Sequence, residues 1–196
     1  MQRQIKEFRK NVNRWFPFQT FYLSLSPKCG ISSQREFIPY YNNMETTLVL
    51  LKPSCVQRQL IGEIVNRFER RGLRIAGMKM MQLDDAILRE HYAHLVDRPF
   101  FPLLAKSMQA SPVVAMALSG VEAVQVVRGM TGFTNGRMAD PGTIRGDYAM
   151  SNQQNIVHAS DSTENAKVEL ARFFRPEEIF DYRSSVMDFL YATNEV

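Results

Sequence analysis

From Met44 onward, the sequence alternates between apolar runs typical of strands and apolar spacings typical of helices. The run TTLVLL (46–51) predicts a buried strand. Ser54 can cap a helix, and the apolar residues of QRQLIGEIVNRFERR (57–71) then recur at helical spacing. The alternation continues with a strand over 73–81, helices over 84–95 and 98–109, a strand over 111–120, a helix ending near Gly129, a loop over 131–154, the strand NIVHA (155–159), a helix over 163–174, and a short helix with a tail.

This order predicts an α+β fold built on a four-stranded antiparallel sheet. The best fit is the ferredoxin-like split βαβ arrangement, with the helices packed on one face of the sheet. Residues 131–154 form an unusually long loop for a compact domain. Because such loops are usually functional or disordered, this segment is a candidate part of a binding site.

Residues 1–43 show no sustained period and hold most of the basic excess of the chain. They contain seven Lys and Arg against two acidic residues, whereas residues 44–196 contain 17 basic and 18 acidic residues. We therefore expect a basic N-terminal extension (1–43) and one folded domain (44–196). The extension is basic and poor in acidic residues, as an organelle transit peptide can be. An unstructured segment, or translation that begins at Met44, is preferred because the ordered pattern starts directly at Met44. The last alternative predicts a cytoplasmic protein, and a transit peptide predicts an organelle.

Two further features bound the class of protein. No window approaches the roughly 18 apolar residues of a membrane span, so we expect no membrane association. Cys29 and Cys55 are the only cysteines, one in each segment, and we expect reduced thiols rather than a disulfide.

The polar residues of the folded segment favour phosphate chemistry. Arg145 lies in PGTIRGD, where two glycines let the backbone approach a ligand, and Arg128 ends the preceding helix. Arginine suits phosphate because its planar fork makes paired, charge-assisted hydrogen bonds. His158 and Glu169 follow, and an imidazole oriented by a carboxylate is a competent nucleophile toward phosphorus. Thr134, Asn135 and Lys52, which follows the first strand, complete the set.

Each of these residues also has an ordinary structural interpretation. A lone histidine at a strand end is more often packed or solvated than catalytic. His91 and His94 stand three apart and could bind a metal, but a helix surface or core role is preferred because no third ligand is nearby. The chain has no GxxxxGK[ST] motif, which disfavours P-loop kinase chemistry. The residues alone therefore indicate a phosphate-handling enzyme and no more.

Several segments in the same order resemble the nucleoside diphosphate kinase family. They are LLKPSCVQRQLIGEIVNRFERRGL, HYAHLVDRPFF, SPVVAMALSG, PGTIRGDY and NIVHASDS, and the resemblance runs from about Glu45 to Tyr182. It implies a ferredoxin-like subunit in a homo-hexamer or homo-tetramer. It also implies ping-pong transfer of the γ-phosphate from a nucleoside triphosphate to a diphosphate through a phosphohistidine. Mg²⁺ is the implied cofactor, bridging the nucleotide phosphates with few direct protein ligands.

The resemblance assigns roles residue by residue. It implies that His158 is the nucleophile, that Glu169 is the carboxylate that orients it, and that Ser160 and Tyr92 support this pair, Ser160 through a hydroxyl beside Glu169 and Tyr92 as a neighbour of the histidine. For the nucleotide, it implies that Lys52 and Asn155 bind the sugar hydroxyls and that Phe100 stacks on the base. The implied phosphate contacts are Arg128, Thr134 and Arg145.

The sequence also departs from the usual family pattern. Ser54 replaces an aspartate, Phe133 replaces a polar or small residue, and Asn152 replaces an apolar residue beside the base. Cys55 places a thiol near the site, for which we expect sensitivity to oxidation. Gly136 replaces a proline and is expected to soften the loop. None removes a group needed for transfer. The rival hypotheses are a non-catalytic nucleotide-binding or scaffold protein on the same fold, and an accessory nucleic-acid-binding role of the basic extension.

Overall fold

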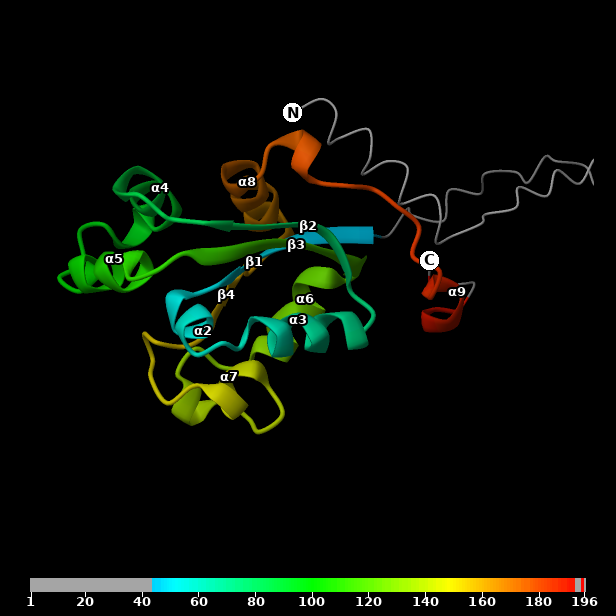
Figure 1. Cartoon of the computed structure of the whole chain (residues 1–196), viewed down its shortest axis with the longest axis horizontal. Coiled ribbons are helices and arrows are strands. Elements are labelled where there is room, and N and C mark those ends of the chain that lie inside the picture. Colours follow the sequence, from blue (N-terminus) through cyan, green and yellow to red (C-terminus); the bar gives the residue numbers. More distant parts are fainter. Residues whose placement is uncertain (1–43, 193–194, 196) are drawn as a thin grey trace, which may run out of the picture. The chain divides into compact units, whose positions relative to one another are not determined.

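The computed structural model describes residues 44–192 and 195. Its centre is a four-stranded sheet, whose place among the helices can be followed in Figure 1. The strands are β1 (Met44–Leu51), β2 (Arg74–Met81), β3 (Val113–Val121) and β4 (Val157–Ala159). Their order across the sheet is β2-β3-β1-β4, and every neighbouring pair is antiparallel. The predicted α+β, ferredoxin-like sheet is therefore confirmed.

Helices fill the connections between these strands and also follow the last strand. They are α2 (Pro53–Gln57), α3 (Ile61–Arg70), α4 (Asp85–His91), α5 (Phe101–Gln109), α6 (Ala123–Thr131), α7 (Ile144–Tyr148), α8 (Thr163–Phe173) and α9 (Met187–Leu190), with 3-10 turns η1 (Ala93–Leu95), η2 (Gly136–Met138) and η3 (Pro176–Glu178). None of the helices in the described ranges is long and apolar enough to cross a membrane.

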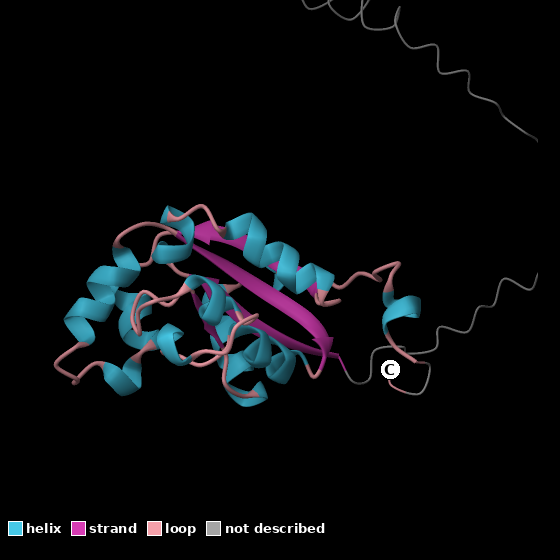
Figure 2. Cartoon of the chain, turned by 90° about the horizontal axis from the view of Figure 1, so that it is seen from below, coloured by secondary structure: helices cyan, strands magenta, loops and turns pink. Residues whose placement is uncertain are grey.

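Helices cover both faces of the sheet, so the expectation of helices on one face is wrong. α8 lies on one side of the strands in Figure 1, and α3, α6 and α7 lie on the other; Figure 2 shows the sheet from that second side. Residues of β1 alternate between the two cores, with Val49 facing α3 and Leu50 facing α8. The apolar run LVLL (48–51) follows from this arrangement because a strand covered on both faces needs no polar side.

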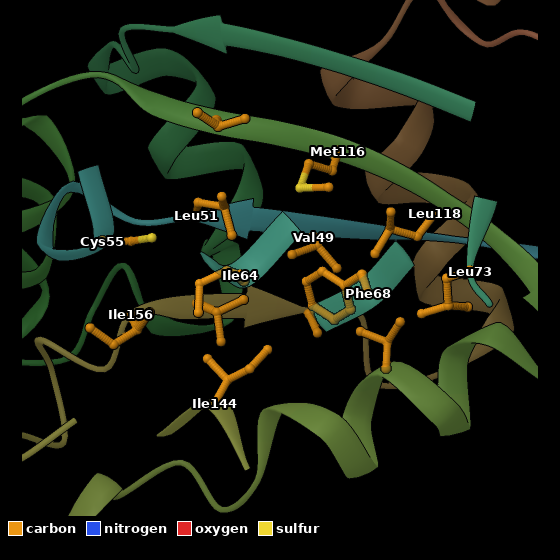
Figure 3. Packing of buried hydrophobic residues seen from close by; sticks show 14 of the residues in the cluster. Val49, Leu51, Cys55, Ile64, Phe68, Leu73, Met116, Leu118, Ile144 and Ile156 are labelled. Atoms are coloured by element: carbon orange, nitrogen blue, oxygen red, sulfur yellow. The ribbon is translucent and has the colours of Figure 1, made fainter. Parts of the chain in front are cut away.

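The core beneath the sheet anchors the first helices. Ile64 and Phe68 of α3 are fully buried against Val49, Met116 and neighbouring residues (Figure 3). Burying an Ile or Phe side chain contributes about 1.5–3 kcal/mol. The packing therefore fixes α3 against β1, and with it the β1–α2 connection that carries Lys52.

Three local expectations differ from the structure. The helix expected over 57–71 is two helices, because Gln59 takes a left-handed φ of 57° between α2 and α3. Ser54 does not cap α2; Lys52 occupies the N-cap position, and Pro53 opens the helix. The long loop holds η2 and α7, and α6 continues past Gly129 to Thr131.

Cys55 lies in the same core, where its surroundings make the thiol unreactive. Its thiol is fully buried and free, and burial raises its pKa to about 11 against the opposing charge of Arg58. Because the thiolate is the reactive form, the expected oxidation sensitivity has no support here. Cys29 and the rest of the basic extension lie outside the described residues.

Candidate active site

A cavity of about 840 Å³ opens beside the ends of β1 and β4 and gathers the residues singled out in the sequence. Nine of the ten predicted site residues line it, and the tenth, Ser160, bonds to Glu169 at its edge. The nine are Lys52, Tyr92, Phe100, Arg128, Thr134, Arg145, Asn155, His158 and Glu169.

The strand that carries His158 begins in a strained turn. Ile156 is buried and has a φ of 70°, a conformation that β-branched residues rarely adopt. The Val157 N–H donates to the Asn155 carbonyl at 2.8 Å, which closes a γ-turn. The Ile156 carbonyl accepts from the Lys52 N–H at 2.9 Å, and the Ile156 N–H donates to Ser54 Oγ at 3.3 Å. NIVHA is therefore strand only from Val157, and the turn places Asn155 beside Lys52.

His158 is held by a carboxylate from α8. Its Nε2 atom lies 3.2 Å from Glu169 Oε1, and Ser160 Oγ donates to Glu169 Oε2. Burial alone would raise the pKa of Glu169, but the hydrogen bond and charge of His158, together with the Ser160 hydroxyl, lower it to about 2. An ionised carboxylate accepts and cannot donate, so the proton of neutral His158 stays on Nε2 and Nδ1 keeps a free lone pair.

Lys52, Asn155 and Thr134 form one hydrogen-bonded chain across the cavity. Lys52 Nζ donates to Asn155 Oδ1 at 2.6 Å, and Asn155 Nδ2 donates to the Thr134 carbonyl at 2.9 Å. Burial, and then the charge of Arg145, lower the pKa of Lys52 to about 8. These hydrogen bonds connect the end of β1, the long loop and the γ-turn. The side chains of Lys52 and Asn155 are therefore held at fixed positions relative to each other in the cavity.

Two arginines supply positive charge of different character. Arg145 is buried on α7 and donates from Nη1 to the Gly132 carbonyl at 2.6 Å and from Nη2 to the Val157 carbonyl at 2.8 Å. Burial, and then the charge of Arg128, lower the pKa of Arg145 to about 10. Arg128 is exposed, and among the described residues its guanidinium has no hydrogen bond or ion pair. The cavity thus pairs one anchored cation with one that is available to a ligand.

Aromatic residues form the remaining wall. Tyr92 is buried with its ring centroid 6.4 Å from that of His158, and burial raises the pKa of its phenol. Phe100 is half exposed and lines the cavity together with Asn152. Asn152 lies in a segment fixed to α5, because Gln153 Nε2 donates to the Leu103 carbonyl at 2.8 Å and Gln154 Nε2 donates to Ser107 Oγ at 2.9 Å. A flat apolar ring at a half-open position suits stacking on a planar ligand.

Several residues of the cavity lining were given no role from the sequence, and His91 and Arg172 are two of them. His91 was expected on a helix surface or in the core without a chemical role, yet its ring lies 4.6 Å from the His158 ring. Arg172 of α8 also lines the cavity and was not singled out. The segment HYAHL carried the only signal for His91, and its placement needs the packing of α4 on α8.

Residues 45–179 match the family model of nucleoside diphosphate kinase. The chain belongs to the nucleoside diphosphate kinase family. A relative in Parabacteroides distasonis, named nucleoside diphosphate kinase, is 60% identical over 152 residues, which are 78% of this chain and 99% of the relative. Human nucleoside diphosphate kinase A is 47% identical over 149 residues, 76% of this chain and 98% of that protein.

Solved structures agree with this assignment. The nucleoside diphosphate kinase of Halobacterium salinarum, solved in complex with CDP, has a TM-score of 0.74 and 40% identity over 76% of this chain and 99% of its own. A Babesia bovis family member has a TM-score of 0.72 and 39% identity over 75% of this chain and 99% of its own. The chain is therefore a phosphotransferase of nucleotide metabolism. The first rival hypothesis, a non-catalytic nucleotide-binding or scaffold protein on the same fold, has no support.

Proposed function

We propose that His158 carries the phosphoryl group, on Nδ1, as the chain transfers the γ-phosphate from a nucleoside triphosphate to a diphosphate. One observation carries the proposal: Glu169 accepts from Nε2, and this leaves Nδ1 as the nitrogen with a free lone pair. The ring lies in the cavity lined by Lys52 and both arginines, where a polyphosphate would be neutralised.

Each half-reaction exchanges one bond to phosphorus for another. The Nδ1 lone pair attacks the γ-phosphorus, the bond to the bridging oxygen breaks, and the diphosphate leaves with the electron pair. The ring then carries a positive charge, and Nε2–H keeps its bond to the ionised Glu169. A second diphosphate attacks the phosphohistidine with its terminal oxygen, and Nδ1 regains its lone pair. One pocket serves both halves because donor and acceptor differ only in one phosphate.

The cationic side chains stabilise the charge that spreads over the transferred group. Such transfers depend on alignment and electrostatic stabilisation more than on covalent chemistry by the protein. Exposed Arg128 is positioned to meet phosphate oxygens, and anchored Arg145 supplies a fixed positive field. Lys52 and Asn155, joined at 2.6 Å, present a donor and an amide for sugar hydroxyls. Phe100 supplies stacking, which any base accepts.

The residues fit a Mg²⁺ ion held mainly by nucleotide phosphates. His91, His158 and Glu169 offer three ligand atoms within 4.8 Å of one another, but two are nitrogens, and Mg²⁺ prefers six oxygen ligands. Glu90 is paired with Arg172, which leaves Asp161 as the exposed carboxylate of the cavity lining. Asp161 would hold a Mg²⁺-bound water, and the ion, when bound, neutralises phosphate charge.

Assembly, location and the extension remain proposals. We propose a homo-hexamer or homo-tetramer, which light scattering coupled to size-exclusion chromatography would distinguish. A cytoplasmic protein that begins at Met44 and an organelle protein with a cleaved extension differ in intact mass. An accessory nucleic-acid role would disappear when residues 1–43 are deleted and would weaken steeply with salt.

A labelling experiment tests the phosphohistidine directly. The purified protein is mixed with γ-³²P-ATP and Mg²⁺ without acceptor, beside His158→Ala and the control His94→Ala, and then chased with a nucleoside diphosphate. We expect acid-labile, alkali-stable label on the wild type and on His94→Ala that leaves with the acceptor, and none on His158→Ala. Label that persists on His158→Ala would assign the nucleophile to another residue.

A further inference from the structure

Glu169 and Arg172 carry opposite charges three residues apart on α8 but do not pair. That spacing normally brings a carboxylate and a guanidinium together on a helix. Here Arg172 Nε donates to Glu90 Oε1 at 2.8 Å instead, whereas the two oxygens of Glu169 accept from His158 and Ser160. Some feature of the packing keeps the two charges apart.

The ring of His91 contacts both charged groups. Its Nδ1 atom is 3.4 Å from Arg172 Nη1 and 3.6 Å from Glu169 Oε1. The side chain is only 1% exposed. The Phe173 ring meets it at a centroid distance of 5.1 Å and an angle of 90°, and the His158 ring meets it at 4.6 Å and 79°. Rings from two elements therefore hold the imidazole in place.

His91 is also uncharged at neutral pH. Burial, and then the neighbouring charge of His158, lower its pKa to about 3, Glu169 opposes the shift, and Arg172 and His94 add to it. A charged ring would itself pair with Glu169 and compete with His158 for Oε1. A neutral ring can separate the charges without this competition.

We propose that His91 is a positioning residue that keeps the Arg172 guanidinium away from the Glu169 carboxylate, so that the carboxylate stays bonded to His158. The inference rests on the proposed role of His158 as nucleophile. With the ring removed, Arg172 can turn to Glu169 and take Oε1. His158 Nε2–H then loses its acceptor, the tautomer with the proton on Nδ1 becomes populated, and that tautomer has no lone pair at the attacking atom.

A double-mutant cycle tests the separation. Single-turnover phosphorylation by ATP is measured for the wild type, His91→Ala, Arg172→Gln and the double variant. We expect His91→Ala to lower the rate by about tenfold or more, because the charge-assisted hydrogen bond between His158 and Glu169 would be lost. Arg172→Gln is measured alone as the reference for the double variant, because Arg172 lines the cavity and can have an effect of its own. We expect the double variant to match Arg172→Gln, because the competing cation is gone.

Two further variants separate this role from simple packing or hydrogen bonding. His91→Leu fills the space without a ring nitrogen and is expected to keep the rate, and Lys167→Gln removes an exposed charge from the same helix as a matched control. ¹⁵N NMR of His158 should show the Nε2–H tautomer alone in the wild type and a mixture in His91→Ala. A loss that Arg172→Gln does not restore, a slow but folded His91→Leu, or an unchanged His91→Ala would each overturn the proposal. The tautomer measurement needs no activity, so a failure of the proposed function is distinguishable from a failure of this inference.

Discussion

The His158 ring and the Glu169 carboxylate, eleven residues apart in the chain, meet at 3.2 Å between Nε2 and Oε1. The strand β4 supplies one and the helix α8 the other, and Ser162 caps that helix by accepting from the Asn165 N–H. The hydrogen-bonded pair is only partly exposed, with 21% of the histidine side chain and 14% of the glutamate side chain accessible. The carboxylate therefore acts on one ring nitrogen with little competition from water.

Glu169→Gln is expected to lower the rate of phosphoenzyme formation by about 100-fold. The amide can donate to Nε2, which favours the tautomer with the proton on Nδ1 and removes the attacking lone pair. Nucleotide binding should change little, because Glu169 faces the ring rather than the phosphates. Rapid-quench labelling and equilibrium nucleotide titration measure the two effects. An unchanged rate would show that the carboxylate does not orient His158.

The same carboxylate should make the stability of the folded chain sensitive to acid. Its pKa is lowered from the ordinary value of 4.5 to about 2, so its stabilising contribution is complete above pH 4.5 and is lost as the pH falls toward 2. Urea unfolding of the wild type and of Glu169→Gln at pH 7 and pH 3 checks this. The difference in unfolding free energy between the wild type and Glu169→Gln should be smaller at pH 3 than at pH 7. A difference in unfolding free energy that does not change with pH would contradict the assignment.

Lys52→Met should weaken nucleotide binding by about tenfold or more at pH 7, because charged hydrogen bonds to the ligand are lost. Lys52 also makes the free energy of unfolding depend on pH. The pKa of Lys52 is lowered from 10.5 to about 8, so the unfolded chain binds more protons between these values. Wild-type stability therefore rises relative to Lys52→Met as the pH increases from 8 to 10.5. Calorimetry across this range measures the trend, and Lys106→Met, on the exposed side of α5, should show none.

Sequence patterns predicted the sheet and most helices, because apolar periodicity acts locally. The family resemblance supplied the ten predicted site residues, and nine of them line one cavity. Sequence patterns missed what depends on contacts between distant segments. Ile156 is β-branched and was expected in a strand, but bonds to Lys52 and Ser54 hold it at a φ of 70°. The segment HYAHL drew attention to His91 but did not indicate its place beside His158, because that neighbour is 67 residues further along the chain. The second helical layer was missed because it forms only when α3 and α6 pack across the sheet.

Gly136 illustrates the same limit and gives the last prediction. In the sequence this glycine suggested a softer loop, but the residue is buried, and an added Cβ would lie 2.3 Å from the Ala149 carbonyl oxygen and 2.5 Å from the Ala149 Cβ. The position is therefore tightly packed, and an added Cβ would collide with Ala149, whereas the expected softening of the loop stays a prediction.

Gly136→Ala is expected to lower the free energy of unfolding by about 1–3 kcal/mol, as overpacking does. The loop also supplies the Thr134 carbonyl that holds Asn155, so nucleotide binding should weaken in parallel. Gly129→Ala is the matched control: an added Cβ meets nothing within 4 Å in the helix α6, and alanine there should stabilise by about 0.5–1 kcal/mol. Urea unfolding distinguishes the two. Equal stabilities for Gly136→Ala and the wild type would contradict the prediction, because the loop would then accommodate a Cβ at residue 136 against Ala149.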